Sequence, residues 1–310
     1  MRQEKLVVIL GPTATGKSRT GILLAQKTGG EIISGDSMLV YRNMNIGTAK
    51  PTEAELALVP HHLVNILPPE AEFSVVDFKA RAQQLITEIN QRGRLPILVG
   101  GTGLYIKALL EDYAFSTVGE NAGLRRELEQ LADREGEAAL VQKLAALDPQ
   151  QAAQVNPHDR RRLIRALETV LGGEQVSRQA AGQPVYQAAV FGLTLERSLL
   201  YARINQRVDA MLAAGLEQET RQLLQAGLSP TALSMRSIGY RQMAQYLAGE
   251  LEHEEMAAKI KQATRNFAKR QFTWYKKMPY IHWFDVEKLP DQEQIVEIMC
   301  QLLVKNYNLL

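Results

Sequence analysis

An octapeptide near the N-terminus constrains the fold of this chain more than any other feature. Gly11-Pro12-Thr13-Ala14-Thr15-Gly16-Lys17-Ser18 matches the pattern G-x-x-x-x-G-K-[ST] at every fixed position. It follows the apolar run Leu6–Leu10, typical of a strand buried on both faces, and opens a helical stretch that reaches about Lys27. In that context the glycines let backbone N–H groups point at phosphate oxygens, while Lys17 adds a charge and Ser18 a hydroxyl suited to Mg²⁺. The octapeptide therefore predicts a loop that binds a polyphosphate.

Further short apolar runs and amphipathic stretches follow in alternation. Strands are predicted at Glu31–Ser34 and Leu95–Val99, and helices at Val75–Asn90 and Thr102–Leu110. Strands and helices in this order indicate a parallel sheet flanked by helices, which is an α/β fold of the P-loop NTPase-like class.

A helix-rich segment interrupts this core. Residues 124–147 and 159–171 have helical spacing, and residues 188–195 return to a strand pattern. The remaining helices are predicted at 198–226, 237–248 and 253–276, with a last strand at Ile281–Phe284. We therefore expect an α/β core formed by residues 1–113 and 185–310, and an all-helical insertion domain formed by residues 114–184.

Composition excludes several classes of protein. The 310 residues include 36 Lys and Arg against 34 Asp and Glu, so the net charge of +2 excludes a polycation but not a local basic patch. The single cysteine, Cys300, excludes an intrachain disulfide or a Cys-ligated zinc site and suits a reducing compartment. No apolar stretch approaches ~18 residues, and the N-terminus does not resemble a signal peptide. We expect a cytoplasmic protein with no membrane partner.

An acidic residue follows the second predicted strand. A P-loop indicates a polyphosphate ligand but not hydrolysis, and the strand Leu95–Val99 ends in Gly100-Gly101-Thr102 without an acid. The acid is Asp36, in Ser34-Gly35-Asp36-Ser37. Because the carboxyl ends of parallel strands face the binding crevice, Asp36 is expected near the ligand, where it could bind a metal or accept a proton. The alternative is a cap of a turn or helix.

The C-terminal third contains a one-sided basic segment. Seven Lys and Arg residues and no Asp or Glu lie between Met256 and Phe284. Cationic stripes interleaved with aromatic residues suit a nucleic-acid backbone with unstacked bases, although a solvated helix face is the simpler alternative. The aromatic residues concerned are Phe272, Trp274 and Tyr275.

Arginines gather in three other places. Four of them lie within 160–165, and Arg236 and Arg241 bracket Ser237-Ile238-Gly239-Tyr240. Arg203 and Arg207 are spaced i, i+4 on a predicted helix, so they could clamp a diphosphate or could pair with acids of the same helix.

These features together resemble the tRNA dimethylallyltransferase (tRNA isopentenyltransferase) family in its bacterial form, without the zinc-finger extension of eukaryotic members. The stretches that carry the resemblance are GPTATGKS (11–18), SGDSMLVYRNMNIGTAKPT (34–52), LVGGTGLYIKALL (98–110), DRRRLIRALE (159–168), SIGYRQM (237–243) and AKRQFTWYKK (268–277). They extend over nearly the whole chain.

The resemblance implies transfer of the dimethylallyl group from dimethylallyl diphosphate to N6 of the adenine 3′-adjacent to the anticodon, position 37. Asp36 would accept the N6 proton with Thr102 beside it, and Ser18 would hold Mg²⁺. The diphosphate would be bound by Gly11, Thr13, Ala14, Thr15, Gly16, Lys17 and Ser18, with Arg207 as the added clamp. We expect the enzyme to act as a monomer. The implied tRNA contacts are Asp36, Ser37, Met38, Leu39, Thr102, Arg125, Arg161, Arg162, Arg165, Arg236, Gly239, Tyr240, Arg241, Lys269, Arg270, Gln271, Trp274 and Lys276.

Two other interpretations stay open from the residues alone. A P-loop kinase of small molecules would use Asp36 on an acceptor hydroxyl, but it leaves the arginine-rich insertion and the basic segment without a role. A nucleotide-gated RNA-binding module explains those surfaces, but it leaves Asp36 and Thr102 without one. Many members of the resembled family have Gln where this chain has Leu39, and others have Leu. The difference leaves the resemblance intact but weakens a hydrogen-bonding role at that position.

Overall fold

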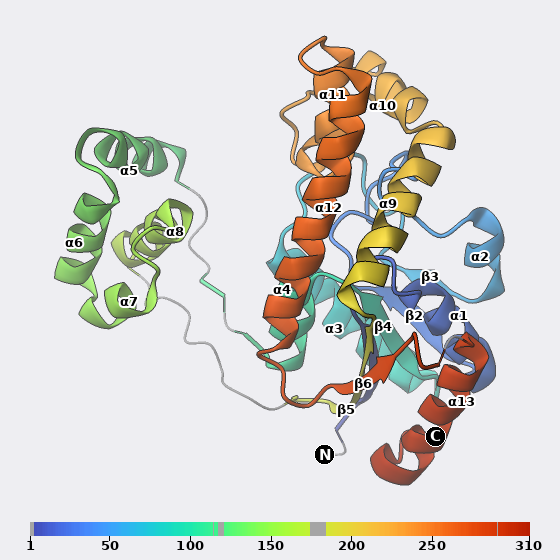
Figure 1. Ribbon diagram of the computed structural model, residues 1–310. Helices are drawn as coiled ribbons and strands as arrows, with labels where there is room; N and C mark the ends of the chain where they lie inside the picture. Colours follow the sequence, from blue (N-terminus) through green and yellow to red (C-terminus); the bar gives the residue numbers. More distant parts are fainter. Residues whose placement is uncertain (1–2, 114, 117–120, 174–183, 290) are drawn as a thin grey trace. The chain divides into compact units, whose positions relative to one another are not determined.

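The computed structural model describes residues 3–113, 115–116, 121–173, 184–289 and 291–310 (Figure 1). The residues form two compact units, each defined by the contacts among its own residues. The larger unit is Met1–Glu111 with Gly182–Leu310, and the smaller unit is Asp112–Ala181. The insertion domain expected at 114–184 overlaps the smaller unit, and both of its expected ends adjoin residues outside the described ranges.

The larger unit is built on one parallel sheet of six strands in the order β3-β2-β4-β1-β5-β6. The central strand β1 pairs on both sides, so that Val8 lies opposite Leu98 of β4 and Val190 of β5. The parallel α/β fold predicted from the sequence is confirmed. The strands are β1 Lys5–Leu10, β2 Glu31–Ser34, β3 His61–His62, β4 Pro96–Gly100, β5 Gln187–Thr194 and β6 His282–Asp285.

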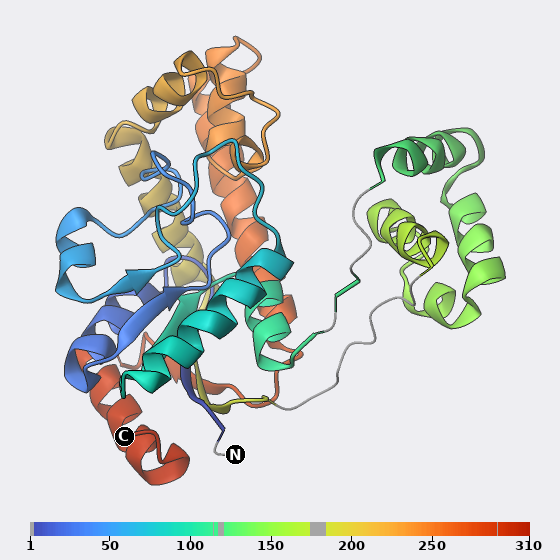
Figure 2. The same ribbon diagram turned by 180° about the vertical axis from the view of Figure 1, so that it is seen from behind.

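Helices cover both faces of this sheet. Successive side chains of a strand point to opposite faces, and here the side chains on both faces are apolar and need to be buried. Leu6, Val8 and Leu10 of β1 enter a core formed with α3 and α4, whereas Val7 and Ile9 enter a second core formed with α1 and α13. The face covered by α3 is turned toward the viewer in Figure 2. The helices of this unit are α1 Lys17–Thr28, α2 Glu53–Leu58, α3 Val75–Gln91, α4 Gly103–Leu110, α9 Arg197–Ala213, α10 Leu216–Gln225, α11 Tyr240–Leu247, α12 His253–Tyr275 and α13 Gln292–Leu302, with a 3₁₀ turn η1 at Ser234–Arg236 and a π-helical turn η2 at Leu303–Tyr307.

The long helix α12 connects several parts of this unit. It packs against α9, α11 and α4, and its C-terminal end lies beside α4 in both ribbon views (Figures 1 and 2). Met256 and Ile260 bury its N-terminal half in the core shared with α3 and α4, while Ala268 joins the core on the α1 side. Residues near its C-terminal end are therefore held close to the carboxyl ends of β1 and β4.

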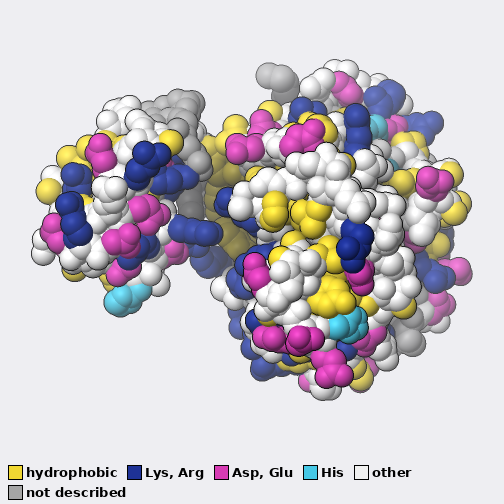
Figure 3. All heavy atoms as spheres, turned by 90° about the horizontal axis from the view of Figure 1, so that it is seen from above, with side chains coloured by type: hydrophobic (Ala, Val, Ile, Leu, Met, Phe, Trp, Pro, Cys, Tyr) yellow, Lys and Arg dark blue, Asp and Glu magenta, His cyan; other side chains and the backbone are white. Residues whose placement is uncertain are grey.

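The smaller unit has its own apolar core, which is formed by one face of each of three helices. Leu128 and Ala132 of α5 pack with Leu140 and Leu144 of α6 and with four residues of α8, Leu163 among them. In the view of Figure 3, Lys and Arg side chains alternate with Asp and Glu side chains over this unit. Its helices are α5 Ala122–Glu135, α6 Glu137–Leu147, α7 Pro149–Gln154 and α8 Arg160–Leu171.

None of the helices in the described ranges combines the length and the apolar character that a bilayer crossing requires.

Candidate active site

Three loops meet at the carboxyl ends of neighbouring strands in the larger unit. The octapeptide follows β1, the Gly35–Met38 loop follows β2, and Gly101-Thr102 follows β4, which lies between β1 and β2. Backbone hydrogen bonds join the last two loops, because Gly35 N donates to Val99 O at 2.8 Å and Thr102 N donates to Gly35 O at 3.4 Å. The topology thus places the phosphate loop, Asp36 and Thr102 at one edge of the sheet, where ligands bind in open α/β folds.

The phosphate loop is closed around one of its own carbonyl groups. Both the hydroxyl of Thr15 and the ammonium of Lys17 donate to Pro12 O, at 2.9 and 2.7 Å. Gly16 precedes α1 with a φ of 91°, which L-residues rarely adopt, and a Cβ on Gly11 would lie 2.5 Å from Leu193 O. The two fixed glycines of the motif are therefore required by the backbone itself.

Two cations and one acid interact electrostatically beside this loop. Burial, and to a lesser extent the nearby charge of Arg207, lower the pKa of Lys17 to about 7, while Asp36 opposes the shift. Burial also lowers the pKa of Arg207, and Asp36 again opposes the shift. Two partly desolvated cations facing one carboxylate leave an excess of positive charge, so this site favours an anion with more than one charged oxygen.

Asp36 combines a structural contact with a free oxygen. Its Oδ1 accepts a hydrogen bond from Met38 N at 2.8 Å, which fixes the turn after β2. Over the described ranges, Oδ2 has no hydrogen-bond partner, so that oxygen can accept a proton. The turn-cap interpretation of Asp36 and its role as a base are thus compatible, because they use different oxygens.

Thr102 lies next to the Asp36 loop. Its Oγ1 accepts a hydrogen bond from Ser37 N at 3.3 Å, and its side chain makes no capping bond to α4, which begins at the next residue. The hydroxyl proton of Thr102 therefore remains available to a ligand bound between this loop and the phosphate loop.

Several of the cations expected to contact tRNA lie on the surface of the larger unit. Arg236 and Arg241 are exposed at either side of the turn that leads into α11. Lys269, Arg270 and Lys276 are exposed near the C-terminal end of α12, with Trp274 partly buried between them. The structure leaves these side chains accessible to a polyanion.

Three residues expected to contact tRNA, Gly239, Tyr240 and Gln271, are buried, and so is Tyr275 of the basic segment. Tyr240 is 0% exposed, and it follows Gly239, which is also buried. Gln271 is 3% and Tyr275 is 1% exposed, and both make hydrogen bonds to backbone atoms of the larger unit. In this structure these side chains are not accessible to a polyanion, and those of Gln271 and Tyr275 bind the backbone of the loops around the site.

The sequence gives no indication of the role of Glu219, which organises the loop at residues 45–47. Its carboxylate accepts hydrogen bonds from the backbone N–H groups of Asn45, Ile46 and Gly47 at 2.8 to 3.1 Å. It also accepts one from the hydroxyl of Tyr240 at 2.5 Å. An acid inside an amphipathic helix predicts a solvent-exposed side chain, so the sequence carries no signal for this role.

Lys50 also binds this part of the chain. Its ammonium donates to Tyr41 O at 2.5 Å, and also to the side-chain oxygens of Asn45 and Asn65 at 3.0 and 2.6 Å. Burial lowers the pKa of Lys50 to about 8. The GTAKP stretch thus has a structural function, because its lysine supplies the donors that close the loop.

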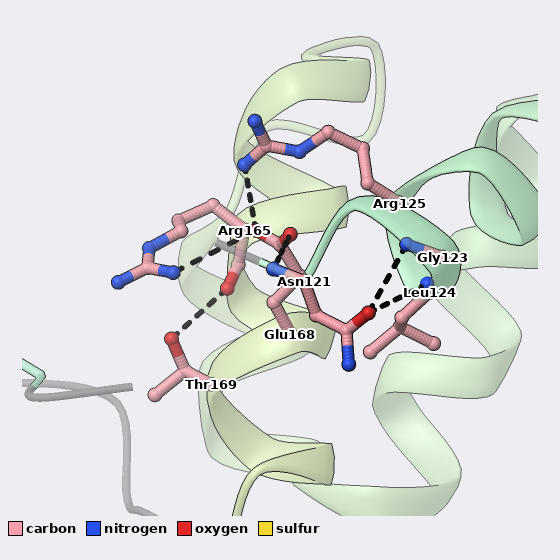
Figure 4. A network of polar contacts seen from close by, with 7 residues as sticks. All are labelled: Asn121, Gly123, Leu124, Arg125, Arg165, Glu168 and Thr169. Atoms are coloured by element: carbon pink, nitrogen blue, oxygen red, sulfur yellow. Dashed lines mark hydrogen bonds and ion pairs between the residues drawn. The ribbon is translucent and has the colours of Figure 1, made fainter. Parts of the chain in front are cut away.

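In the smaller unit, a buried carboxylate lies between two of the arginines expected to contact tRNA (Figure 4). Glu168 Oε2 accepts a hydrogen bond from Arg125 at 2.8 Å and lies 3.6 Å from Arg165, while the Glu168 side chain is fully buried. Arg161 and Arg162 are exposed on the same helix, α8. The structure therefore places Arg125 and Arg165 together and leaves Arg161 and Arg162 facing solvent.

Comparison with known proteins decides the family. The profile of the IPP transferase family matches residues 39–278. The chain belongs to the IPP transferase family. This membership confirms the family expected from the six stretches of sequence.

The chain is similar to members of this family over nearly its whole length. It is 47% identical over 300 residues to the tRNA dimethylallyltransferase of Pelotomaculum thermopropionicum, covering 96% of this chain and 95% of that protein. It is 49% identical over 287 residues to the tRNA dimethylallyltransferase of Geobacillus kaustophilus, covering 91% of each.

Solved structures extend this similarity to the fold. The full-length tRNA isopentenylpyrophosphate transferase from Bacillus halodurans matches with a TM-score of 0.73 at 43% identity, covering 98% of each chain. A eukaryotic dimethylallyltransferase acting on tRNA matches with a TM-score of 0.79 at 28% identity, covering 98% of this chain and 80% of the other.

Proposed function

We propose that this protein is a tRNA dimethylallyltransferase that acts as a monomer. It transfers the dimethylallyl group of dimethylallyl diphosphate to N6 of adenine 37, giving N6-isopentenyladenosine and diphosphate. The observation that carries the proposal is the meeting of Lys17, Arg207 and Asp36 at one edge of the sheet. The names of similar proteins, which span nearly the whole chain, support the same activity.

The diphosphate end of the donor would bind the phosphate loop. The N–H groups of Ala14 to Ser18 and the N-terminus of α1 would face a bound anion in this motif, whereas Thr13 N donates to Gln271 Oε1. Lys17 and Arg207 supply positive charge. As the bond between the allylic carbon and the diphosphate oxygen breaks, negative charge grows on the leaving group, and these groups stabilise it.

A magnesium ion fits this donor set. The described residues contain no cluster of three or more His, Cys, Asp and Glu side chains that could hold a metal ion by themselves. Ser18, exposed in the first turn of α1, offers one hydroxyl oxygen, and Mg²⁺ commonly completes its coordination with phosphate oxygens and water. When bound, the ion would neutralise charge on the diphosphate.

The adenine would react on the side of Asp36. The exocyclic nitrogen is a weak nucleophile, because its lone pair is delocalised into the ring. As N6 forms its bond to the allylic carbon, positive charge develops on nitrogen, and Asp36 Oδ2 takes the N6 proton and later releases it to solvent. A positioned base contributes about 10²- to 10⁴-fold to the rate, and the Thr102 hydroxyl lies beside the reacting groups.

Binding of tRNA would rely on the exposed cations. A stacked adenine cannot reach Asp36, so the base must leave its stack at a cost of a few kcal/mol. Phosphate contacts offset that cost without reading sequence. The cations we assign to this function are Arg161, Arg162, Arg236, Arg241, Lys269, Arg270 and Lys276.

The test is an incubation of the protein with bulk tRNA, Mg²⁺ and either dimethylallyl diphosphate labelled in its prenyl group or ATP labelled in its γ-phosphate. The proposal predicts label in tRNA from the prenyl donor only, recovered as N6-isopentenyladenosine after digestion. Transfer of phosphate from ATP to any acceptor would favour the kinase interpretation. Binding of tRNA without transfer of either label would favour an RNA-binding module.

A further inference from the structure

The C-terminal end of α12 has two faces with different tasks. Lys269, Arg270 and Lys276 are exposed and belong to the surface proposed to bind tRNA. Gln271 and Tyr275, spaced i, i+4 in the same two turns, face inward and are 3% and 1% exposed. Gln271 and Tyr275 have no part in the chemistry described above, although both contact the backbone of the phosphate loop.

Gln271 joins two of the three loops of the site. Its Oε1 accepts a hydrogen bond from Thr13 N at 3.1 Å, and its Nε2 donates to Gly101 O at 2.8 Å. Thr13 belongs to the phosphate loop, and Gly101 directly precedes Thr102. One side-chain amide therefore connects the diphosphate-binding loop to the loop that carries Thr102.

Tyr275 makes a second connection between the same loops. Its hydroxyl lies 2.9 Å from Gly11 O and 3.1 Å from Gly101 O, the backbone carbonyls at the ends of adjacent strands β1 and β4. Burial raises the pKa of Tyr275 well above its usual range, so the hydroxyl keeps its proton and remains a donor.

The glycines after β4 allow α12 to approach this closely. A Cβ on Gly101 would lie 2.3 Å from Gln271 Nε2, and a Cβ on Gly103 would lie 2.5 Å from the Cβ of Trp274. The Gly-Gly-Thr-Gly stretch and the C-terminal end of α12 are thus two sides of one close contact.

We propose that Gln271 and Tyr275 are positioning residues that fix the separation between the phosphate loop and Thr102, and that they tie both to the helix whose outer face binds tRNA. The inference rests on the proposed function, since the separation matters only if donor and adenine react between these loops. A misplacement of reacting atoms by 1 Å can lower a rate by about 10²-fold, so the loss of either connection should slow transfer.

The experiment compares Tyr275→Phe and Gln271→Met with the control Tyr280→Phe. The control also removes one tyrosine hydroxyl bound to a protein oxygen, since Tyr280 donates to Glu111 Oε1 at 2.9 Å. Glu111 directly follows α4, and the eight residues of that helix, about 12 Å, separate it from the Thr102 loop. For each variant the kcat of prenyl transfer, the KM for dimethylallyl diphosphate, the Kd for tRNA and the Tm are measured.

The proposal predicts that Tyr275→Phe and Gln271→Met each lower kcat about tenfold or more, while the Kd for tRNA stays within about threefold of wild type. Tyr280→Phe should keep wild-type kcat, even where its Tm falls as far as that of Tyr275→Phe. A smaller fall in kcat, or an equal fall in the control, overturns the positioning role. Should Tyr275→Phe fail to fold, Gln271→Met decides the question alone. Absence of transfer by the wild-type protein would instead refute the proposed function.

Discussion

The ionisation of Lys17 provides a quantitative test of the diphosphate site. Its pKa is lowered to about 7 because the ammonium is desolvated and lies near Arg207. A diphosphate that binds the phosphate loop brings negative charge next to this ammonium and stabilises its protonated form. Binding must therefore raise the pKa of Lys17, so Lys17 takes up a proton from solution when the ligand binds at a pH above about 7.

The size of the pH effect on diphosphate affinity follows from the fraction of Lys17 that is protonated before binding. With a pKa of about 7, about half of the side chains carry the proton at pH 7 and about 1% at pH 9. If only the protonated form binds, affinity falls about 50-fold between these pH values, equivalent to about 2 kcal/mol.

Isothermal titration calorimetry with inorganic diphosphate measures this effect. Lys17→Arg serves as the matched control, because an arginine stays protonated throughout this range. The ratio of wild-type to variant affinity cancels the ionisation of the ligand itself, and it should fall about 50-fold from pH 7 to pH 9. At pH 8, titrations in two buffers of different ionisation enthalpy should show that the wild-type protein takes up about 0.9 proton more per diphosphate bound than Lys17→Arg does.

A ratio that stays constant between pH 7 and pH 9, with no proton uptake at pH 8 beyond that of Lys17→Arg, would refute this reasoning. It would mean that the ammonium of Lys17 is protonated before the ligand arrives or does not contact the ligand.

Two further predictions concern the carboxylates of Glu168 and Glu219. Glu168→Gln removes the negative charge that Arg125 and Arg165 share. Because these arginines are 34% and 40% exposed, water screens part of the effect. We expect the free energy of unfolding, measured by thermal denaturation, to fall by about 1–2 kcal/mol. The control Glu129→Gln, at an acid 43% exposed and 3.6 Å from Arg160, should change stability by less than about 0.5 kcal/mol, and equal losses in the two variants would contradict the prediction. Glu219→Ala removes the acceptor of three backbone N–H groups and should cost about 2 kcal/mol in urea unfolding. The control is Glu217→Ala on the same helix, since Glu217 is 43% exposed and lies 2.7 Å from Arg221. This control should lower the free energy of unfolding by less than about 0.5 kcal/mol. A Glu219 variant as stable as the control would show that the Glu219 carboxylate does not hold the loop.

The sequence predicts the sheet well because most of its strands are buried on both faces. The runs Leu6–Leu10 and Leu95–Val99 are continuous and apolar, and they become β1 and β4 within a residue or two. Strand β3 has no such signal, because only His61 and His62 pair with β2. Helix α2 is six residues long and has no buried side chain, so it gives no helical pattern of apolar residues in the sequence either.

The candidate site also contains residues that the sequence predicts and residues that it does not. The phosphate loop is predictable because eight consecutive residues supply its amides, lysine and hydroxyl. Gln271 and Glu219 are not, because a polar residue on an amphipathic helix indicates exposure. Both are buried or bound in the structure because they satisfy backbone groups of loops far away in the sequence. Helical periodicity identifies a face but not which backbone lies against it.

The transfer rate of Asp36→Asn tests the central claim most directly. The variant keeps the size of the side chain and an oxygen that can accept the hydrogen bond from Met38 N, but it cannot take the N6 proton. Single-turnover transfer should slow by about 10²- to 10⁴-fold, while the Kd for tRNA, measured by filter binding, stays within a few-fold of wild type. Transfer at the wild-type rate, or a loss that lies wholly in tRNA affinity, would contradict the assignment of Asp36 as the base.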